Sequence, residues 1–212
     1  MAQRTIHYLF GDIISNQITL TDKNRFLLGS IIADAVETSD RDQSHFKIKT
    51  DTHVYYDFEL FRKKYSVQIM QDDLYLGYYM HLLEDTFYRS FIYQDRFTMP
   101  VTPEEIQVLH NDYHILNAYI VSKYKIHNEL EGTFALDNEP INEIATFHID
   151  KFLTELSYDF MEQPSGRTYY LTENMLDEFI EKYISLAVDE IKNIKTGKSR
   201  LKPSDYAWLR RR

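Results

Sequence analysis

The stretch LGYYMHLLEDTFY, residues 76–88, places a histidine and an aspartate four positions apart in a run that is otherwise mostly apolar and aromatic. Residues four apart share one face of an α-helix, with about 5–6 Å between their Cβ atoms, so His81 and Asp85 can reach the same cation. Gly77 lies one turn earlier and leaves room for another group, at a cost of about 1 kcal/mol in helix propensity relative to alanine. The pattern predicts a helix from about residue 74 to 93. It is compatible with a metal site or with a histidine hydrogen-bonded to its own carboxylate neighbour.

Most of the remaining chain repeats apolar residues at helical spacing. The clearest segment opens with Thr102, Pro103 and Glu105, which form a capping box with proline at the first helical position. Only HFKIKTDTHVYYDF, residues 45–58, alternates as a strand or extended loop would. The other expected helices cover an opening stretch from Thr5, a short piece at 57–66, and residues 102–125, 139–160 and 172–194. These patterns predict an all-α, single-domain multi-helix bundle.

Length and composition limit the classes of protein and site. A chain of 212 residues is long enough for one domain with a substantial core. The chain has no cysteine, so any metal must be held by His, Asp and Glu. The longest apolar runs fall well short of the roughly 20 residues that cross a bilayer, which predicts no transmembrane segment. The opening residues MAQRTIHYLFGDIISNQI carry no recognisable export signal, so we expect a cytoplasmic protein.

Charge is distributed unevenly along the chain. The net charge is −9, yet residues 192–212 hold eight Lys and Arg side chains against the single acidic residue Asp205. We therefore expect a helical metal-binding domain over residues 1–195 and a basic C-terminal tail over 196–212. The acidic body disfavours duplex nucleic acid as a partner. The tail is expected to be a solvated segment, with peripheral contact to an anionic membrane as the alternative.

Several short motifs follow one another in an ordered series. His7 lies on a helical face, LGS-x-x-x-Asp34 follows, Ser44-His45-Phe46 comes next, and LG-x-x-x-His81-x-x-x-Asp85 completes the series. Over about residues 5 to 120 this series resembles the zinc-dependent phospholipase C family, which is related in fold to the S1/P1 nucleases. The resemblance implies a bundle of phospholipase C/P1 nuclease type whose zinc ions activate water to cleave a phosphoester. It also implies that His7, Asp34, His45, His81 and Asp85 are metal ligands, with Asp34 and Asp85 at the catalytic centre and Asp85 bridging two ions.

A third metal site of that family uses a further histidine and an HxxxE motif, for which residues 86–97 supply no histidine. The stretch LHNDYHILN, residues 109–117, offers His110, Asp112 and His114 as substitutes. Hydrogen bonding with tyrosines in the core is the alternative interpretation of these three residues. His148 shares an apolar stripe with neighbouring helical positions and is expected to be a core histidine.

Two hypotheses about function follow from these patterns. The first is a metal-dependent hydrolase that uses Zn²⁺, as two ions, or another divalent metal, to cleave a small phosphoester or a lipid headgroup. The second is a non-catalytic helical binding or scaffold protein with a structural or vestigial metal site. The sequence indicates neither the substrate nor the oligomeric state.

Overall fold

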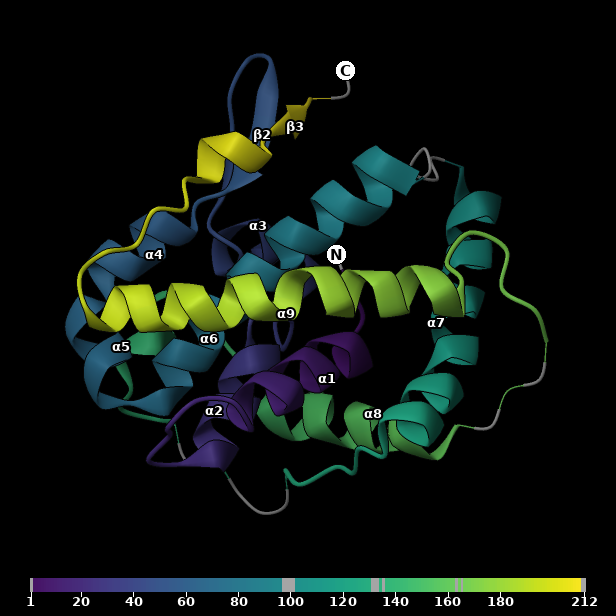
Figure 1. Ribbon diagram of the computed structural model, residues 1–212, viewed down its shortest axis with the longest axis horizontal. Helices are drawn as coiled ribbons and strands as arrows, with labels where there is room; N and C mark the ends of the chain where they lie inside the picture. The colour runs from purple at the N-terminus through teal and green to yellow at the C-terminus, as the bar shows by residue number, and fades with distance from the viewer. Residues whose placement is uncertain are drawn as a thin grey trace.

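The computed structural model describes residues 2–96, 102–130, 134, 136–162, 164 and 166–210, and it is mostly helical (Figure 1). The prediction of a helical fold is confirmed at this level. The α-helices are α1 (Arg4–Ser15), α2 (Lys23–Ile32), α3 (Arg41–Ser44), α4 (Phe58–Lys64), α5 (Ser66–Gln71), α6 (Asp73–Tyr88), α7 (Pro103–Tyr124), α8 (Ile149–Met161) and α9 (Glu173–Lys195). The chain continues from α6 as a π-helix (Arg89–Arg96), and three short 3₁₀ turns lie at Thr38–Asp40, Pro140–Glu143 and Pro203–Tyr206.

Helix α6 occupies the centre of the bundle. Every side chain from Leu74 to Tyr88 is buried, which is expected for a helix surrounded by other elements on all sides. Its neighbours include α1, α2, α4, α5 and α9. Helix α9 crosses the front of the view in Figure 1 and packs on α1 and α6 through Phe179, whose ring lies 5.7 Å from Phe10 and 5.3 Å from Tyr88. Buried rings of this size supply much of the apolar stabilisation of a core.

Two glycines bring α2 and α6 into backbone contact. A Cβ atom on Gly77 would lie 2.1 Å from the carbonyl oxygen of Phe26, and a Cβ on Gly29 would lie 2.1 Å from that of Leu74. No larger side chain fits at either position without separating the helices. The room that the sequence leaves at Gly77 is therefore filled by α2. This close approach places the C-terminal end of α2 beside His81.

The predicted extended segment forms two short strands, β1 (Lys47–Lys49) and β2 (His53–Tyr56). They pair antiparallel, and β3 (Trp208–Leu209) joins the other edge of β2, with His53 opposite Leu209. The Trp208 ring lies 5.1 Å from Tyr56, and the Arg89 guanidinium lies 4.1 Å above the Trp208 ring. The sheet lies at one end of the bundle, at the top of Figure 1.

The basic C-terminal segment follows α9, which ends at Lys195. The segment differs from a solvated tail because residues 203–209 return to the sheet. Pro203 is buried, and the backbone N–H of Arg210 donates to the carbonyl oxygen of Thr52 at 2.8 Å. Arg211 and Arg212 lie outside the described residues. The backbone of this segment is thus held against the folded body, while the side chains of Lys198, Arg200, Lys202 and Arg210 are exposed.

The predicted helix ends agree unevenly with the structure. Thr102 and Glu105 form the expected capping box of α7. The helix predicted for 139–160 begins later, at Ile149, because the N–H of His148 donates to the carbonyl oxygen of Ala35 at 2.6 Å instead of extending the helix backwards. His148 is exposed, so the expectation of a core histidine is wrong. Among the described residues, no helix is long and apolar enough to span a bilayer.

Candidate metal centre

Four segments deliver the five predicted ligands to one place. Helix α1 carries His7, the turn after α2 carries Asp34, and the residue after α3 is His45. Helix α6 carries His81 and Asp85, and the hydroxyl of Tyr78 on α6 donates to the carbonyl oxygen of Ser44, which fixes the segment that bears His45. All five side chains are buried, with Asp34 the most accessible at 7%. The structure therefore brings together residues that are spread over most of the first 85 positions.

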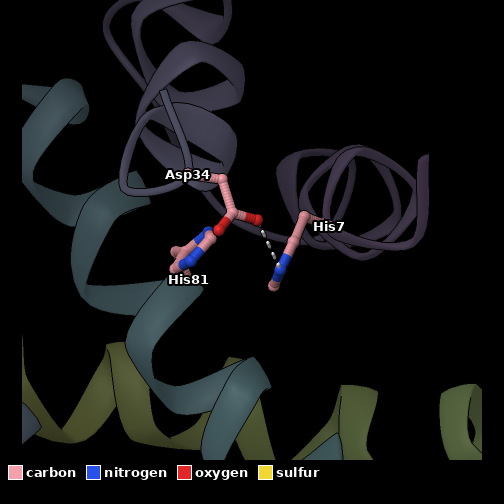
Figure 2. Close-up of side chains that lie close together, drawn as sticks. All are labelled: His7, Asp34 and His81. Carbon is pink, nitrogen blue, oxygen red and sulfur yellow. Dashed lines mark ion pairs between the residues drawn. The ribbon is translucent and has the colours of Figure 1, made fainter. Parts of the chain in front are cut away.

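The potential ligand atoms face one another at short distances. His7 Nε2 lies 3.6 Å from both Asp34 Oδ2 and Asp85 Oδ1, and His45 Nε2 lies 3.4 Å from both Asp34 Oδ1 and Asp85 Oδ2. His81 Nε2 lies 3.1 Å from His45 Nε2. Figure 2 shows the Asp34 carboxylate directed between the rings of His7 and His81, which come from different helices. Each carboxylate thus spans two imidazoles.

Backbone carbonyls fix the tautomers of two of these histidines. His81 Nδ1 lies 2.9 Å from the carbonyl oxygen of Ser30, and His45 Nδ1 lies 2.9 Å from that of Arg41. A carbonyl oxygen only accepts hydrogen bonds, so each Nδ1 is the N–H donor and each Nε2 of the neutral ring carries a lone pair. When both rings are neutral, the two Nε2 atoms that face one another are both acceptors. Such a contact is repulsive unless a cation lies between the lone pairs.

Three further atoms in the cluster are buried and have no hydrogen-bond partner, namely His7 Nε2, Asp34 Oδ1 and Asp85 Oδ2. Buried polar atoms without partners are uncommon in folded proteins, and each one requires a physical explanation. Nitrogen lone pairs and carboxylate oxygens that converge without a donor match the ligand preference of Zn²⁺ and related divalent ions. The residues present therefore fit a metal ion.

Glu84 belongs to this cluster although the sequence did not single it out. Its carboxylate is hydrogen-bonded to His7 Nδ1, and its side chain is buried. A carboxylate on the second ring nitrogen of a histidine ligand fixes the ring and increases its basicity. The only signal in the sequence is the adjacent pair Glu84-Asp85 on a buried helix. Asp85 is held in turn by the backbone N–H of Ala2, which donates to Oδ1 at 3.0 Å.

Burial controls the protonation of the cluster. It lowers the pKa of His7 below its ordinary value and lowers the pKa of His81 to about 3, so both rings are neutral at pH 7. Burial, together with the charges of Asp85 and Asp34, raises the pKa of Glu84 well above its ordinary value. Neutral imidazoles are the form that binds metals. Crowded carboxylates without a cation destabilise one another, which a divalent ion would relieve.

His110, Asp112 and His114 do not join this cluster. Asp112 is fully buried, as expected, but its carboxylate accepts hydrogen bonds from the backbone N–H groups of Tyr169, Tyr170 and Leu171 at 2.8, 2.6 and 3.0 Å. These bonds fix the chain before α9 and leave Asp112 with a structural role. His110 and His114 lie on the exposed face of α7. None of the three supplies a third site beside the other five.

His114 does take part in a second group that could hold a metal, with Asp159 and Glu162. Hydrogen-bond donors already occupy that group. Arg4 Nε donates to Asp159 Oδ2 at 2.8 Å, and Asn117 Nδ2 donates to Glu162 Oε2 at 2.7 Å. The carboxylates there are satisfied without an ion.

Two cavities adjoin the buried cluster. Asp34 lines one of about 170 Å³, and His45 lines the other, of about 200 Å³. Two of the potential ligands thus border a cavity, and Asp34 is the one with exposed surface.

No protein-family model matches the chain, and comparisons with curated proteins and with solved structures give no significant match.

Proposed function

We propose that the buried cluster binds divalent metal, with Zn²⁺ the first choice, and that the protein is a metal-dependent phosphoester hydrolase. One observation carries the metal proposal: His7 Nε2, Asp34 Oδ1 and Asp85 Oδ2 are buried without a hydrogen-bond partner, beside the facing Nε2 atoms of His45 and His81. The hydrolase proposal adds the ordered motifs that resemble the zinc-dependent phospholipases C. The bundle type suggested by that resemblance is part of the same proposal.

The arrangement favours two ions over one. The potential ligands form two groups, His7 with Asp34 and His81, and His45 with His81 and Asp85. The single lone pair on His81 Nε2 can serve only one ion, whereas each carboxylate has oxygens directed toward two imidazoles. Asp34 and Asp85 are therefore the residues able to bridge two ions.

Bound Zn²⁺ would supply an activated water at neutral pH and would neutralise charge on a phosphoryl oxygen. The chain contributes the remaining requirements. Glu84 and the carbonyl oxygens of Ser30 and Arg41 orient the three imidazoles, each through its Nδ1 atom. Asp34 lies at the wall of a cavity, where a substrate can approach the cluster.

A non-catalytic protein with a structural metal is the second candidate, and the depth of the cluster favours it. Four of the five potential ligands are fully buried or nearly so, which is typical of closed structural sites. The accessible edge at Asp34 favours catalysis instead. Only an activity measurement on metal-loaded protein separates the two.

The test begins with metal content and then measures turnover. Wild type, Asp85→Asn and the exposed control Asp189→Asn are loaded with Zn²⁺ or Mn²⁺, desalted and analysed for bound metal. Hydrolysis is followed with a chromogenic phosphodiester, a phosphocholine ester, phospholipid vesicles and short single-stranded DNA. We expect metal and turnover in wild type and Asp189→Asn, with both lost in Asp85→Asn. Stoichiometric metal without turnover on any substrate would favour the scaffold protein with a structural metal over the hydrolase. Absence of bound metal would refute both proposals.

A further inference from the structure

Arg41 lies where the two cavities beside the cluster meet. It lines the 170 Å³ cavity together with Asp34 and Lys151, and it lines the 200 Å³ cavity together with His45 and Lys47. Each cavity borders one potential metal ligand. Arg41 is therefore the cationic residue common to both approaches to the cluster.

The structure ties Arg41 to the cluster through its backbone. Arg41 begins α3, and its carbonyl oxygen accepts a hydrogen bond from His45 Nδ1 at 2.9 Å. The same carbonyl oxygen accepts from the hydroxyl of Ser44 at 3.2 Å. The side chain of Arg41 thus starts from a helical turn whose position is fixed relative to a potential ligand.

The guanidinium of Arg41 has no carboxylate partner within the described residues. Its Nε atom is buried without a hydrogen-bond partner, and no ion pair joins the side chain to any carboxylate described. A buried cationic donor without a partner carries a desolvation cost. An anionic ligand that enters the cavity would remove this cost.

Acidic and basic side chains line the 170 Å³ cavity in equal number, but two of the basic ones form no ion pair with the residues described. Lys151 lines it and forms no ion pair with the described residues, whereas Arg4 is paired with Glu155 and Asp159. The acidic residue Glu37 faces His148 at 3.7 Å. Thus Arg41 and Lys151 are the two cations on the wall that form no ion pair with the residues described.

We propose that Arg41, with Lys151, binds the phosphate group of an anionic phosphoester in this cavity and holds it beside the ion-binding edge of Asp34. This inference rests on the proposed function and adds the substrate class and the residue that recognises it. The cavity is smaller than the roughly 300 Å³ at which pockets for drug-sized ligands begin, so it accepts a phosphate with a small substituent. The planar guanidinium suits phosphate because it donates two parallel hydrogen bonds.

The experiment measures binding of inorganic phosphate by calorimetry to Zn²⁺-loaded and to Zn²⁺-free protein. The variants are Arg41→Gln, which removes the charge, Arg41→Lys, which keeps the charge without the planar fork, and the exposed control Arg200→Gln. We expect Arg41→Gln to weaken phosphate binding about tenfold or more, Arg41→Lys to weaken it less, and Arg200→Gln to have no effect. Bound metal should be equal in all four proteins. With a soluble phosphoester, Arg41→Gln should raise KM more than it lowers kcat.

The outcomes separate this inference from the proposed function. Failure of wild type to bind Zn²⁺ refutes the proposed function. In that case the metal-free protein tests the present inference: phosphate binding that weakens in Arg41→Gln supports it, and phosphate binding that does not depend on Arg41 overturns it. Normal Zn²⁺ content with unchanged phosphate affinity in Arg41→Gln overturns the inference and leaves the proposed function standing. If circular dichroism shows that Arg41→Gln is unfolded, Lys151→Gln and Arg41→Lys decide, and unchanged phosphate affinity in both again overturns it.

A final arm identifies the source of the phosphate. Hydrolysis is compared for a water-soluble phosphocholine ester and for phosphatidylcholine vesicles, in wild type and in Arg41→Lys. Because the cavity is small and polar, we expect the soluble ester to be cleaved in preference and to show the larger dependence on Arg41. Cleavage confined to vesicles would overturn the assignment of a small soluble phosphoester.

Discussion

Histidines and carboxylates of the described residues bring their ligand atoms within 4.8 Å of one another in two regions, the buried cluster of two groups that share His81 and the group of His114, Asp159 and Glu162, yet the surroundings differ. The cluster around His81 is buried, and hydrogen-bond acceptors in it face other acceptors. The group of His114, Asp159 and Glu162 lies near the surface and receives hydrogen bonds from Arg4 and Asn117. The comparison teaches that proximity of ligand types is a weak indicator of a metal site. Buried acceptors that lack donors are the stronger one.

The physical reason is the cost of burying charge. A carboxylate near solvent or beside an arginine is stabilised by water or by its partner. A carboxylate at the centre of a helix bundle has neither, so the fold that places it there requires another source of positive charge. We therefore expect the same substitution to change metal affinity in the buried cluster and to leave it unchanged in the surface group.

The largest effect is expected from removal of a bridging charge. Asp85→Asn keeps the size of the side chain but removes the charge that a cation needs, so metal affinity should fall by more than about 100-fold, beyond the 10- to 100-fold typical of residues that only orient a ligand. Asp159→Asn in the surface group should leave metal affinity unchanged. Metal titration of both variants with a competing chelator provides the measurement. Equal loss in the two variants would remove the distinction between the groups.

The second-largest effect is expected from removal of the metal by a chelator. An ion that binds only the folded protein stabilises it by mass action, by about 4 kcal/mol at a free concentration 1,000 times its Kd. EDTA should therefore lower Tm, and added Zn²⁺ should restore it. His81→Ala should abolish this response, and His114→Ala should retain it. A Tm that does not respond to EDTA in protein shown to contain metal would contradict the coupling of the ion to the fold.

A smaller effect is expected from the residue that orients His7. Glu84→Gln keeps a hydrogen-bonding group on His7 Nδ1 but replaces the carboxyl group, which can become a carboxylate when an ion binds, by a neutral amide, so metal affinity should fall by about 10- to 100-fold. Glu162→Gln makes the corresponding change beside His114 and should have no effect on metal affinity. Zn²⁺ competition assays give both values. An unchanged affinity in Glu84→Gln would reduce Glu84 to a packing role.

The smallest expected effect is the pH dependence of the metal-free protein. The pKa of His81 falls from 6.5 in the unfolded chain to about 3 in the fold, so the unfolded chain binds more protons between these values. The contribution to stability is full above about pH 6.5 and declines as the pH falls toward 3. At pH 5.5 the loss is about 1 to 2 kcal/mol. Urea unfolding of chelated wild type and His81→Gln at pH 7.5 and 5.5 tests this, since the variant should lose less stability.

Local patterns in the sequence are sufficient for part of the fold. The capping box at Thr102 and the apolar spacing of residues 172–194 predict α7 and α9 closely, because both signals act within one or two turns of a helix. The start of α8 could not be predicted in this way. It depends on a hydrogen bond from His148 to Ala35, a residue more than 100 positions earlier.

The candidate site, like the fold, could be predicted from the sequence only in part. The order of five polar residues in apolar surroundings is visible in the sequence and points to His7, Asp34, His45, His81 and Asp85. The sequence also offers His110, Asp112 and His114 as substitutes for a third site, and nothing local decides whether they bind a metal or form hydrogen bonds in the core. In the structure, three backbone N–H groups donate hydrogen bonds to the Asp112 carboxylate, and His110 and His114 are exposed. These contacts distinguish the three residues from the five that converge.

The sequence by itself determined the helical class, the ligand types available to a cation and the room left at Gly77 for a neighbouring group. Only the tertiary structure decided which polar atoms lack partners, that Glu84 orients His7, and that Arg41 lines the approach to the cluster. The reason is the range of the interactions. Helix periodicity and capping involve residues within a few positions, whereas burial and hydrogen bonding join side chains 77 positions apart, as at His7 and Glu84. Those long-range contacts exist only once the bundle has formed.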